Sequence, residues 1–552
     1  MSKEGNAYGN FASGRREFIS RTGLALTGLM LSPALLHSCA PAASLAHIKG
    51  GMRGADFSLG HLLRQPGKLP APTRTERAEV LIIGGGITGL SAKRWLQRSG
   101  LSDVVLLELE NHVGGNAASG QNAVSAYPWG AHYLPIPDVR NRELLAFLQE
   151  ANVITGYSAD GLPIYNEYHL CHDPEERLYI NGHWQQGLVP EFGVPDADRQ
   201  QIARFLALVE ELRHAKGTDG LDAFAIPLDR SSADEQFRQL DAITFAEYLG
   251  REGFSSPYLR WFLAYSCRDD YGATPEQVSA WAGLHYFAAR KGRAHNAEQA
   301  DVLTWPEGNG YLVEQLRRQT TQGIRPNTLA YQLRETATGV EVLTYDGTTK
   351  QTTRFEARKV LLATPHFVTQ RLLAGLADAP QLTPAPHHAP WVIANLTVDG
   401  LPQGPGQPLC WDNVLYNSQS VGYISATHQQ VTQPIGPQVI TLYWPLSHPD
   451  ANAARREAYQ TSYNDWLQRV VAELETAHPG ITPRIQHAEV WVWGHGMVAP
   501  TPGYLWGSNR QAAAQPLRNK LYFAHTDLSG ISIFEEAFYQ GIRAATEMLL
   551  PA

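Results

Sequence analysis

Residues 79–89 read EVLIIGGGITG, and this stretch decides the fold. Residues 80–83 of this stretch form an apolar run, which is typical of a strand buried on both faces of a parallel sheet. The glycines Gly84, Gly86 and Gly89 follow in the spacing G-x-G-x-x-G. In this pattern the first glycine permits a tight turn, the second lets the backbone approach a pyrophosphate, and the third lets the next helix pack against the strand. The stretch predicts a helix over about residues 88–99 that binds a dinucleotide at its amino terminus.

A second apolar run follows at residues 104–107 and ends at Glu108, 24 residues after Gly84. An acid at about this distance hydrogen-bonds an adenosine ribose hydroxyl in dinucleotide-binding folds. Because a carboxylate repels a 2′-phosphate, the position of Glu108 disfavours NADP. The alternative interpretation is an ordinary glycine-rich turn with a surface glutamate.

Later segments resemble flavoproteins of the amine oxidase and phytoene desaturase type. Residues 111–116 (NHVGGN) resemble the glycine doublet that follows the ribose acid in that family. Residues 305–312 (WPEGNGYL) resemble its P-x-G-G-x-x-x-L stretch, and residues 521–527 (LYFAHTD) resemble its carboxy-terminal flavin motif. The resemblance extends over roughly residues 78–552 in the family's order, and it implies FAD as the cofactor.

The resemblance also implies roles for single residues. Those proposed for the ADP half are Gly84, Gly86, Gly89 and Glu108, with Gly114 and Gly115 close to the pyrophosphate and Asn116 beside them. The backbone near Leu329 would contact adenine, Asp527 would bind the ribityl chain or a phosphate, and the helix start near Phe534 would point N–H groups at the isoalloxazine carbonyl.

The chain departs from the family pattern in four places. Asn116 stands where an arginine is usual, the segment 524–527 is one residue longer, and Glu536 replaces a glycine at a helix start. The segment 389–395, which in many amine oxidases carries a lysine against the flavin N5, has none. The missing lysine puts amine oxidation in doubt and leaves the flavin prediction unaffected.

The predicted fold class is α/β, with a discontinuous Rossmann-like FAD-binding domain and a second, substrate-binding domain of mixed sheet and helices. Helical patterns at residues 141–151, 198–216 and 244–251 belong to the second domain, as do strand-like runs between residues 386 and 516. The expected segments are a signal peptide (1–39), a linker (40–77), three FAD-binding parts (78–145, 301–370, 516–552) and two substrate parts (146–300, 371–515).

The composition excludes several classes of protein. The chain has 552 residues and a net charge of −8, whereas binding to nucleic acid requires a basic excess. Four cysteines in this length exclude a disulfide scaffold, and Cys171, Cys267 and Cys410 are expected to be buried thiols. No pair of His, Cys, Asp or Glu has convincing metal-ligand spacing, so we expect no metal site.

The amino terminus resembles an export signal. Arg15 and Arg16 precede a short apolar stretch at residues 23–36, which resembles the twin-arginine signal for proteins exported after folding. Residues 36–39 (LHSC) resemble a lipoprotein box with Cys39 as the lipid-bearing residue. The alternatives are an uncleaved anchor and an incidental cysteine. We expect a periplasmic or extracytoplasmic protein, with membrane attachment only through this signal or Cys39.

Candidate substrate-side residues come from several segments. His132 and His495 are candidate catalytic bases, because neutral imidazole can accept a proton near neutral pH. Trp491 and Trp493 alternate on a predicted strand and would share one face, and they are candidate substrate contacts together with Tyr539.

The polar stretch 266–272 is either a substrate-facing loop or a turn with an internal ion pair. The sequence as a whole predicts an exported enzyme that transfers hydride from a C–H bond of a small molecule, which could be an amine, to FAD, with oxygen or a quinone as electron acceptor. The alternatives are a desaturase or isomerase of an apolar substrate, and a non-catalytic FAD- or NAD-binding partner protein.

Overall fold

The computed structural model describes residues 45–320, 322–376, 378–430 and 436–551. Residues 45–552 group into one compact unit, which contains two large sheets. The predicted signal peptide, with Arg15, Arg16 and Cys39, lies outside the described residues. Among the helices that the structure describes, none is long and apolar enough to cross a membrane.

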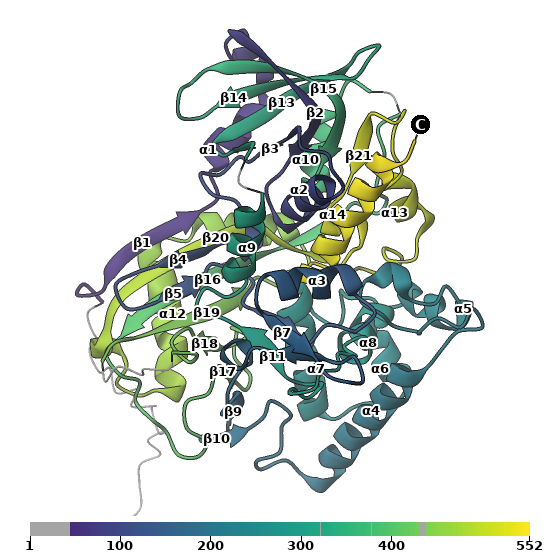
Figure 1. Cartoon of the computed structure of the whole chain (residues 1–552). Coiled ribbons are helices and arrows are strands. Elements are labelled where there is room, and N and C mark those ends of the chain that lie inside the picture. The colour runs from purple at the N-terminus through teal and green to yellow at the C-terminus, as the bar shows by residue number, and fades with distance from the viewer. Residues whose placement is uncertain (1–44, 321, 377, 431–435, 552) are drawn as a thin grey trace, which may run out of the picture. The chain divides into compact units, whose positions relative to one another are not determined.

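The first sheet has seven strands and contains the glycine-rich stretch (Figure 1). Its order is β12-β3-β2-β15-β14-β13, and β21 pairs with β15. The strands are β2 (Arg74–Ile83), β3 (Val104–Leu107), β12 (Ile324–Arg325), β13 (Thr328–Glu335), β14 (Val340–Asp346), β15 (Thr352–Leu362) and β21 (Leu521–Phe523). The pairs β2–β3, β2–β15 and β15–β21 are parallel, so the strand ends that precede the glycine loop and the flavin motif lie at one edge.

The predicted helix is α2 (Ile87–Arg98), and it packs against the carboxy-terminal α14 (Phe534–Leu549). This packing is close, because a Cβ on Gly541 would lie 2.3 Å from the carbonyl oxygen of Thr88. The predicted strand–turn–helix–strand order of the nucleotide-binding unit is confirmed.

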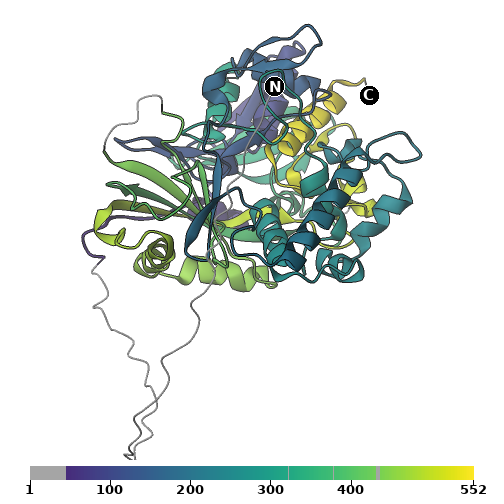
Figure 2. The same cartoon turned by 90° about the horizontal axis from the view of Figure 1, so that it is seen from below.

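The second sheet has eight strands in the order β1-β20-β16-β19-β18-β17-β9-β10. They are β1 (Lys49–Gly54), β9 (Glu176–Ile180), β10 (His183–Gln186), β16 (His387–Val398), β17 (Asp412–Leu415), β18 (Tyr423–Ser425), β19 (Gln438–Pro445) and β20 (Ile485–Ala499). Helices α11 (Ala451–Gln460) and α12 (Tyr463–Ala477), yellow-green in Figure 2, run along this sheet. Trp466, Val470 and Leu474 of α12 share a core with Val392 and Leu442 of the sheet.

The remaining elements are helices and short strand pairs. The helices are α1 (Phe57–Gly60), α3 (Arg142–Glu150), α4 (Asp196–His214), α5 (Glu235–Arg238), α6 (Phe245–Arg251), α7 (Pro257–Tyr271), α8 (Ala280–Ala288), α9 (Gly310–Gln319), α10 (His366–Leu372) and α13 (Ser508–Ala513). The short strands are β4 (Ser119–Gln121), β5 (Ala126–Pro128), β6 (Tyr133–Pro135), β7 (Ile154–Tyr157), β8 (Pro163–Tyr165) and β11 (Val302–Thr304). The mixed α/β fold agrees with the predicted class, while the residue boundaries of the segments stay a prediction.

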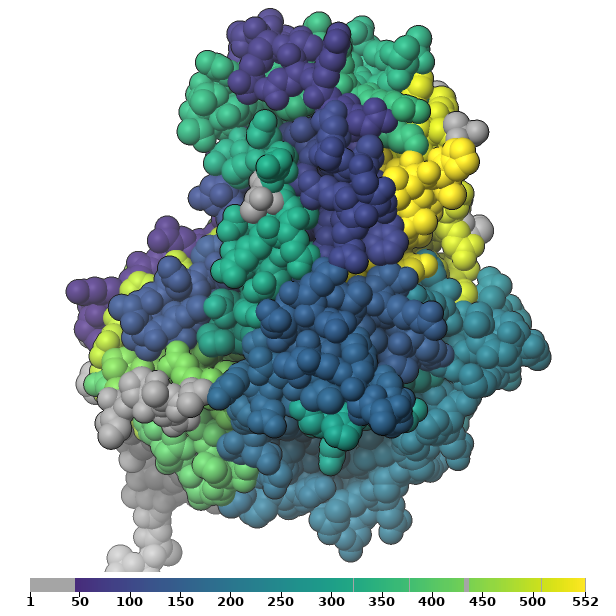
Figure 3. All heavy atoms as spheres, viewed as in Figure 1, coloured from purple at the N-terminus to yellow at the C-terminus, as the bar shows by residue number. Residues whose placement is uncertain are grey.

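The structure differs from the predicted linker over residues 45–77. Lys49–Gly54 pairs in parallel with His487–Val492 of β20, and Leu59 and Leu63 are buried against the first sheet. Figure 3 shows these purple residues beside the green residues of the β13–β15 region. The proline and glycine content suggested a flexible tether, but long-range strand pairing and apolar burial hold this part of the chain to the body.

Candidate cofactor-binding site

One large cavity, of about 1320 Å³, lies between the two sheets. The predicted residues that line it are Gly84, Gly86, Glu108, Gly114, Gly115, Asn116, Leu329, Asp527, Phe534, Trp493 and His495. Residues separated by more than 400 positions in the chain therefore meet at one site, at the carboxyl ends of parallel strands where α/β folds bind their ligands.

The three glycines have distinct surroundings that match their predicted roles. Gly84 has φ +110°, and a Cβ there would lie 2.3 Å from the carbonyl oxygen of Ala363. A Cβ on Gly89 would lie 1.9 Å from the carbonyl oxygen of Gly84, so only glycine lets α2 approach β2 this closely. Around Gly86, by contrast, nothing lies within 4 Å of an added Cβ, which would project into open space at the start of α2.

The glycine doublet packs directly onto this loop. Gly114 has φ +119° and its N–H donates to the carbonyl oxygen of Gly85 at 2.8 Å. Gly115 has φ +55° and its added Cβ would lie 3.5 Å from the Cα of Gly86. Asn116 donates from Nδ2 to the carbonyl oxygen of Gly496, so this side chain ties the doublet to β20.

Glu108 lies at the end of β3 and faces the glycine loop. Its Oε2 accepts the N–H of Gly85 at 2.7 Å, and its Oε1 accepts the N–H of Glu110 at 2.8 Å. Burial raises the pKa of Glu108 to about 7, although these backbone hydrogen bonds act in the opposite direction. Each carboxylate oxygen has two lone pairs, so the side chain can still accept ribose hydroxyls.

Asp527 is buried beneath a group of histidines. Its Oδ1 lies 2.8 Å from Nε2 of His388 and 3.2 Å from Nδ1 of His525, and its Oδ2 accepts the N–H of His366 at 2.7 Å. Burial acts to raise the pKa of Asp527, but His388 and His525 outweigh it and hold the pKa well below its usual value. The acid of the flavin motif is therefore an oriented anion.

Phe534 begins α14 and lines the cavity, as the predicted isoalloxazine contact requires. The departure at Glu536 has a structural explanation. Its side chain is fully buried and accepts the N–H of Leu228, and burial raises its pKa to about 8. Glu536 thus fastens the loop at Leu228 to α14 where the family has a glycine.

These residues fit FAD. The open space above Gly86 at the amino terminus of α2 suits a pyrophosphate, and the Glu108 carboxylate lies within the same loop. No group of three or more His, Cys, Asp and Glu that could hold a metal ion occurs among the described residues.

The candidate substrate-side residues divide into two groups. Trp493 and His495 line the cavity, and Trp493 donates from Nε1 to the carbonyl oxygen of Trp129 at 2.6 Å. Trp491 lies behind them and stacks on Trp129, with ring centroids 4.1 Å apart. Tyr539 does not line the cavity, because its position on α14 turns it towards Arg230, 6.0 Å from the ring centroid.

His132 lies beside the cavity within a group of aromatic rings. Its ring centroid is 4.4 Å from that of Tyr443 and 5.6 Å from that of Trp411, while its neighbour Ala131 lines the cavity. Burial lowers the pKa of both His132 and His495 to about 3. Both imidazoles are therefore neutral near pH 7, and both are weak bases.

A carboxylate cluster that the sequence did not reveal lies near Tyr443. It consists of Asp269 on α7, Asp412 on β17 and Glu176 on β9, and Asp412 and Glu176 are direct partners across paired strands. Burial, followed by the charge of Asp270, raises the pKa of Asp269 to about 7. Burial, with the charges of Asp269 and Glu176, raises that of Asp412 well above its usual value. The polar stretch 266–272 was the available signal for Asp269, but its partners come from distant strands.

One interpretation of residues 266–272 was a turn with an internal ion pair. The ion pair that the structure shows instead joins Asp270 to Arg290, which lies outside that stretch. Arg290 donates from Nη2 to Oδ1 of Asp270 at 3.0 Å and to the hydroxyl of Tyr133 at 3.2 Å. Asp270 is thus paired with Arg290, whereas Asp269 makes no ion pair within the described residues. Cys171, Cys267 and Cys410 are free and buried, as expected.

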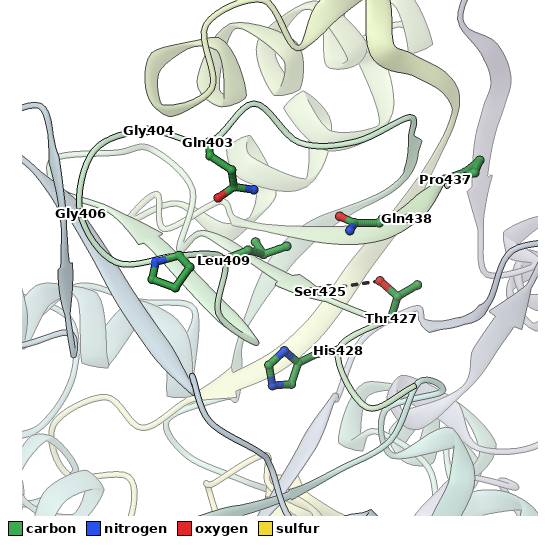
Figure 4. Close-up of a pocket in the computed structure, with 10 residues that line it drawn as sticks. Gln403, Gly404, Gly406, Leu409, Ser425, Thr427, His428, Pro437 and Gln438 are labelled. Atoms are coloured by element: carbon green, nitrogen blue, oxygen red, sulfur yellow. Dashed lines mark hydrogen bonds between the residues drawn. The ribbon is translucent and has the colours of Figure 1, made fainter. Parts of the chain in front are cut away.

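A second pocket, of about 420 Å³, contains none of the predicted site residues (Figure 4). Polar side chains line part of it, including those of Gln403, Gln438 and His428. Ser425 and Thr427 share a hydrogen bond of 3.3 Å at its wall. The predicted cofactor residues therefore do not line this second pocket.

Comparisons with known proteins identify the family. The chain matches the family described as Flavin containing amine oxidoreductase over residues 87–549. A stretch of 106 residues is 46% identical to polyamine oxidase 7 of Oryza sativa subsp. japonica. That match spans 18% of this chain and 22% of the rice protein, so it covers well under two thirds of that relative.

Solved structures share the fold at low identity. A double mutant of putrescine oxidase aligns with TM-score 0.63 and 16% identity, over 86% of this chain and 99% of that one. A fatty acid isomerase from P. acnes aligns with TM-score 0.60 and 16% identity, over 86% and 99% of the two chains. Cyclohexylamine oxidase from Brevibacterium oxydans IH-35A aligns with TM-score 0.57 and 15% identity, over 85% and 98%.

The family match begins within the glycine loop and ends in α14, so it spans most of the residues that line the cavity described above. Its extent, together with the glycine loop, Glu108 and Asp527, establishes that the chain belongs to the flavin containing amine oxidoreductase family and is an FAD-dependent oxidoreductase.

Proposed function

We propose that this enzyme oxidises a small amine by transferring hydride from the C–H bond beside the nitrogen to FAD. The observation that carries the proposal is the carboxylate cluster of Asp269, Asp412 and Glu176. Charges of this cluster act on Tyr443, whose ring packs against His132, the neighbour of the cavity residue Ala131. A group of buried carboxylates with too few cations is a suitable environment for an ammonium group.

Aromatic rings lie near this cluster. The pKa of Tyr443 is raised by burial and then by the charges of Asp412 and Asp269, and its hydroxyl donates to the carbonyl oxygen of Gly130 at 3.0 Å. His132 packs against the Tyr443 ring, with ring centroids 4.4 Å apart. Aromatic faces attract cations and exclude water, so these rings suit an amine that reaches from the carboxylates towards the cofactor.

FAD supplies the redox chemistry when it is bound, as a hydride acceptor. The residues of this chain bind the amine and accept its proton. An ammonium nitrogen must lose a proton before hydride can leave the neighbouring C–H bond. The positive charge on the nitrogen would otherwise oppose the departure of hydride. Asp269, with a pKa of about 7, is matched to accept this proton at neutral pH. This assignment gives a role to a carboxylate in a chain whose strand β16 contains no lysine.

The direct test is reduction of the bound flavin under argon by a panel of amines, amino acids, sterols and polyenes. We expect small amines to reduce it, and we expect Asp269→Asn and Asp412→Asn to slow that reduction by about 100-fold, the loss typical of a general base. Asp196→Asn, on the exposed start of α4, is the matched control and should not change the rate. Reduction or isomerisation of apolar substrates alone would instead support a desaturase or isomerase. Under air, peroxide formation would identify oxygen as the acceptor, and turnover only with added quinone would identify a quinone.

We also propose that the protein is exported by the twin-arginine route and anchored at Cys39. The support is the sequence of residues 15–39 alone. Because β1 starts at Lys49, ten residues after Cys39, a lipid at Cys39 would hold the body within about 36 Å of a membrane, at no more than about 3.6 Å per residue. Arg15→Lys with Arg16→Lys should leave precursor in the cytoplasm, and Cys39→Ala should release mature protein in soluble form. Normal delivery of the first variant, or membrane retention of the second, would refute the respective part.

A further inference from the structure

Residues 52–64, here called the amino-terminal strap, cross from one sheet to the other. The segment leaves β1, which is paired with β20 of the second sheet, and continues into α1 and a short 3-10 helix at His61–Arg64. Figure 1 shows this purple segment passing from β1 up to the strands of the first sheet. The strap precedes residue 87, where the family match begins.

Several contacts hold the strap in place. The N–H of Asp56 donates to Oε1 of Glu110 at 2.8 Å, and the Asp56 side chain caps α1 by accepting the N–H of Leu59. Leu59 and Leu63 are buried in the core of the first sheet, with exposed fractions of 6% and 9%. Phe57 packs edge-on against Tyr459 of α11, with ring centroids 5.7 Å apart. The strap is therefore attached to both sides of the cavity.

The strap forms a wall of the cofactor cavity. Its residues that line the same cavity as the glycine loop are Met52, Arg53, Gly54, Ala55, Asp56, Phe57, Gly60, His61, Leu63 and Arg64. A ligand that fills this cavity would therefore contact the strap as well as the glycine loop.

Two guanidinium groups on this wall have no anionic partner. Arg64 of the strap and Arg371 of α10 both line the cavity, and among the described residues neither makes an ion pair or a side-chain hydrogen bond. They lie close to the same imidazole: after burial, the charges of Arg64 and Arg371 are what lower the pKa of His61. The charge of Arg64 also contributes to the lowered pKa of His495. Arg64 and Arg371 thus lie near the same imidazole at the cavity, with no ion-pair partner among the described residues.

Bound FAD would supply the missing negative charge. A diphosphate carries two negative charges, and the arginine that usually follows the glycine doublet in this family is Asn116 here. The side chain of Asn116 is neutral and is already bonded to Gly496. The glycine loop offers backbone N–H groups and a helix dipole, but no full positive charge from a side chain.

We propose that the amino-terminal strap is part of the FAD-binding site, and that Arg64 and Arg371 bind the cofactor's diphosphate. The proposal rests on FAD as the cofactor and is independent of the amine substrate. It gives the amino-terminal strap a role in retaining the cofactor.

The first test measures FAD release from the purified holoprotein, followed by the rise in flavin fluorescence after dilution. We expect Arg64→Gln and Arg371→Gln each to release FAD about tenfold faster, since each removes a charge-assisted contact. Added salt should speed release from the wild type more than from either variant, because screening weakens the same contacts. Lys68→Gln is the matched control: Lys68 follows the strap but does not line the cavity, and its loss should leave the rate unchanged.

The second test uses the cofactor-free full chain and trypsin, which cleaves after Arg64 and after Lys68. Both FAD and ADP should protect the bond after Arg64 in the wild type, whereas adenosine, which lacks the diphosphate, should protect it weakly. Arg371→Gln retains this cleavage site and should lose most of the protection by ADP. Unchanged release rates in both variants would overturn the proposal, as would equal protection by adenosine and ADP. Neither result depends on turnover of any substrate.

Discussion

The Nε2 atom of His388 lies 2.8 Å from Oδ1 of Asp527, although 139 residues separate the two positions. His388 belongs to β16 of the second sheet, and Asp527 follows β21 of the first. The pair therefore joins the two sheets at the wall of the cofactor cavity. It also explains how a fully buried acid of the flavin motif remains ionised.

Removal of this partner should destabilise the protein. We expect His388→Ala to lower the free energy of unfolding by about 3 kcal/mol, because the Asp527 carboxylate would stay buried with fewer partners. His387→Ala is the control, since the adjacent imidazole makes no contact with Asp527, and it should cost well under about 1 kcal/mol. The pKa of Asp527 is depressed, so the stabilisation is present above its unfolded value of 3.8 and is lost as pH falls through the folded pKa. Urea unfolding at pH 7 measures the difference, and equal losses in the two variants would contradict it.

Two glycine substitutions in one loop should fail in different ways. Gly86→Ala places a methyl group in open cavity space, so the fold should survive while the purified protein carries less than about a tenth of the wild-type FAD. Gly89→Ala forces a methyl group against the Gly84 carbonyl, so it should lower the stability of the cofactor-free protein by about 3 kcal/mol. Flavin absorbance per protein and thermal unfolding distinguish the two outcomes. A Gly86→Ala protein that retains its flavin would contradict the assigned position of the pyrophosphate.

Affinity for FAD should depend on pH through Glu108. Its pKa is raised to about 7 by burial, and only the carboxylate form accepts ribose hydroxyls with both oxygens. Binding then releases a proton below this pKa, so affinity should rise by up to about tenfold per pH unit below pH 7 and level off above it. Glu108→Gln should bind FAD more weakly and remove this dependence, whereas Glu79→Gln on β2 should leave it intact. Titration of the cofactor-free protein, followed by flavin fluorescence, provides the curve; a flat wild-type profile would argue against the contact.

The rate of flavin reduction by an amine should rise as pH increases through about 7, because Asp269 becomes a carboxylate there and can bind the ammonium group. His132 and His495 have pKa values of about 3, so neither changes charge over this range. Asp269→Asn should therefore abolish the rise, while His132→Gln and His495→Gln should keep it. Stopped-flow reduction under argon between pH 5.5 and 8.5 is the measurement. Loss of the rise in a histidine variant would assign the proton to that imidazole instead.

The nucleotide-binding unit was predictable because its signal is local. An apolar run, glycines at fixed spacing and an acid at the end of the next run each act through neighbouring backbone geometry, and the structure shows the strand, turn and helix where they were expected. Tyr539 illustrates the limit of such reasoning. It was a candidate substrate contact, but the side on which a helical residue points depends on what the helix packs against, and Tyr539 lies towards Arg230.

The sequence by itself determined the α/β class, the FAD-binding loop and the resemblance to flavin-dependent oxidases. Only the tertiary structure decided that residues 45–77 are part of the body, that Arg64 and Arg371 line the cofactor cavity, and that Asp269, Asp412 and Glu176 gather in one cluster. The physical reason is the range of the interactions. Local spacing fixes turns and helix starts, whereas strand pairing between residues 49–54 and 487–492, and the burial of charges from distant segments, depend on contacts that local sequence patterns do not record.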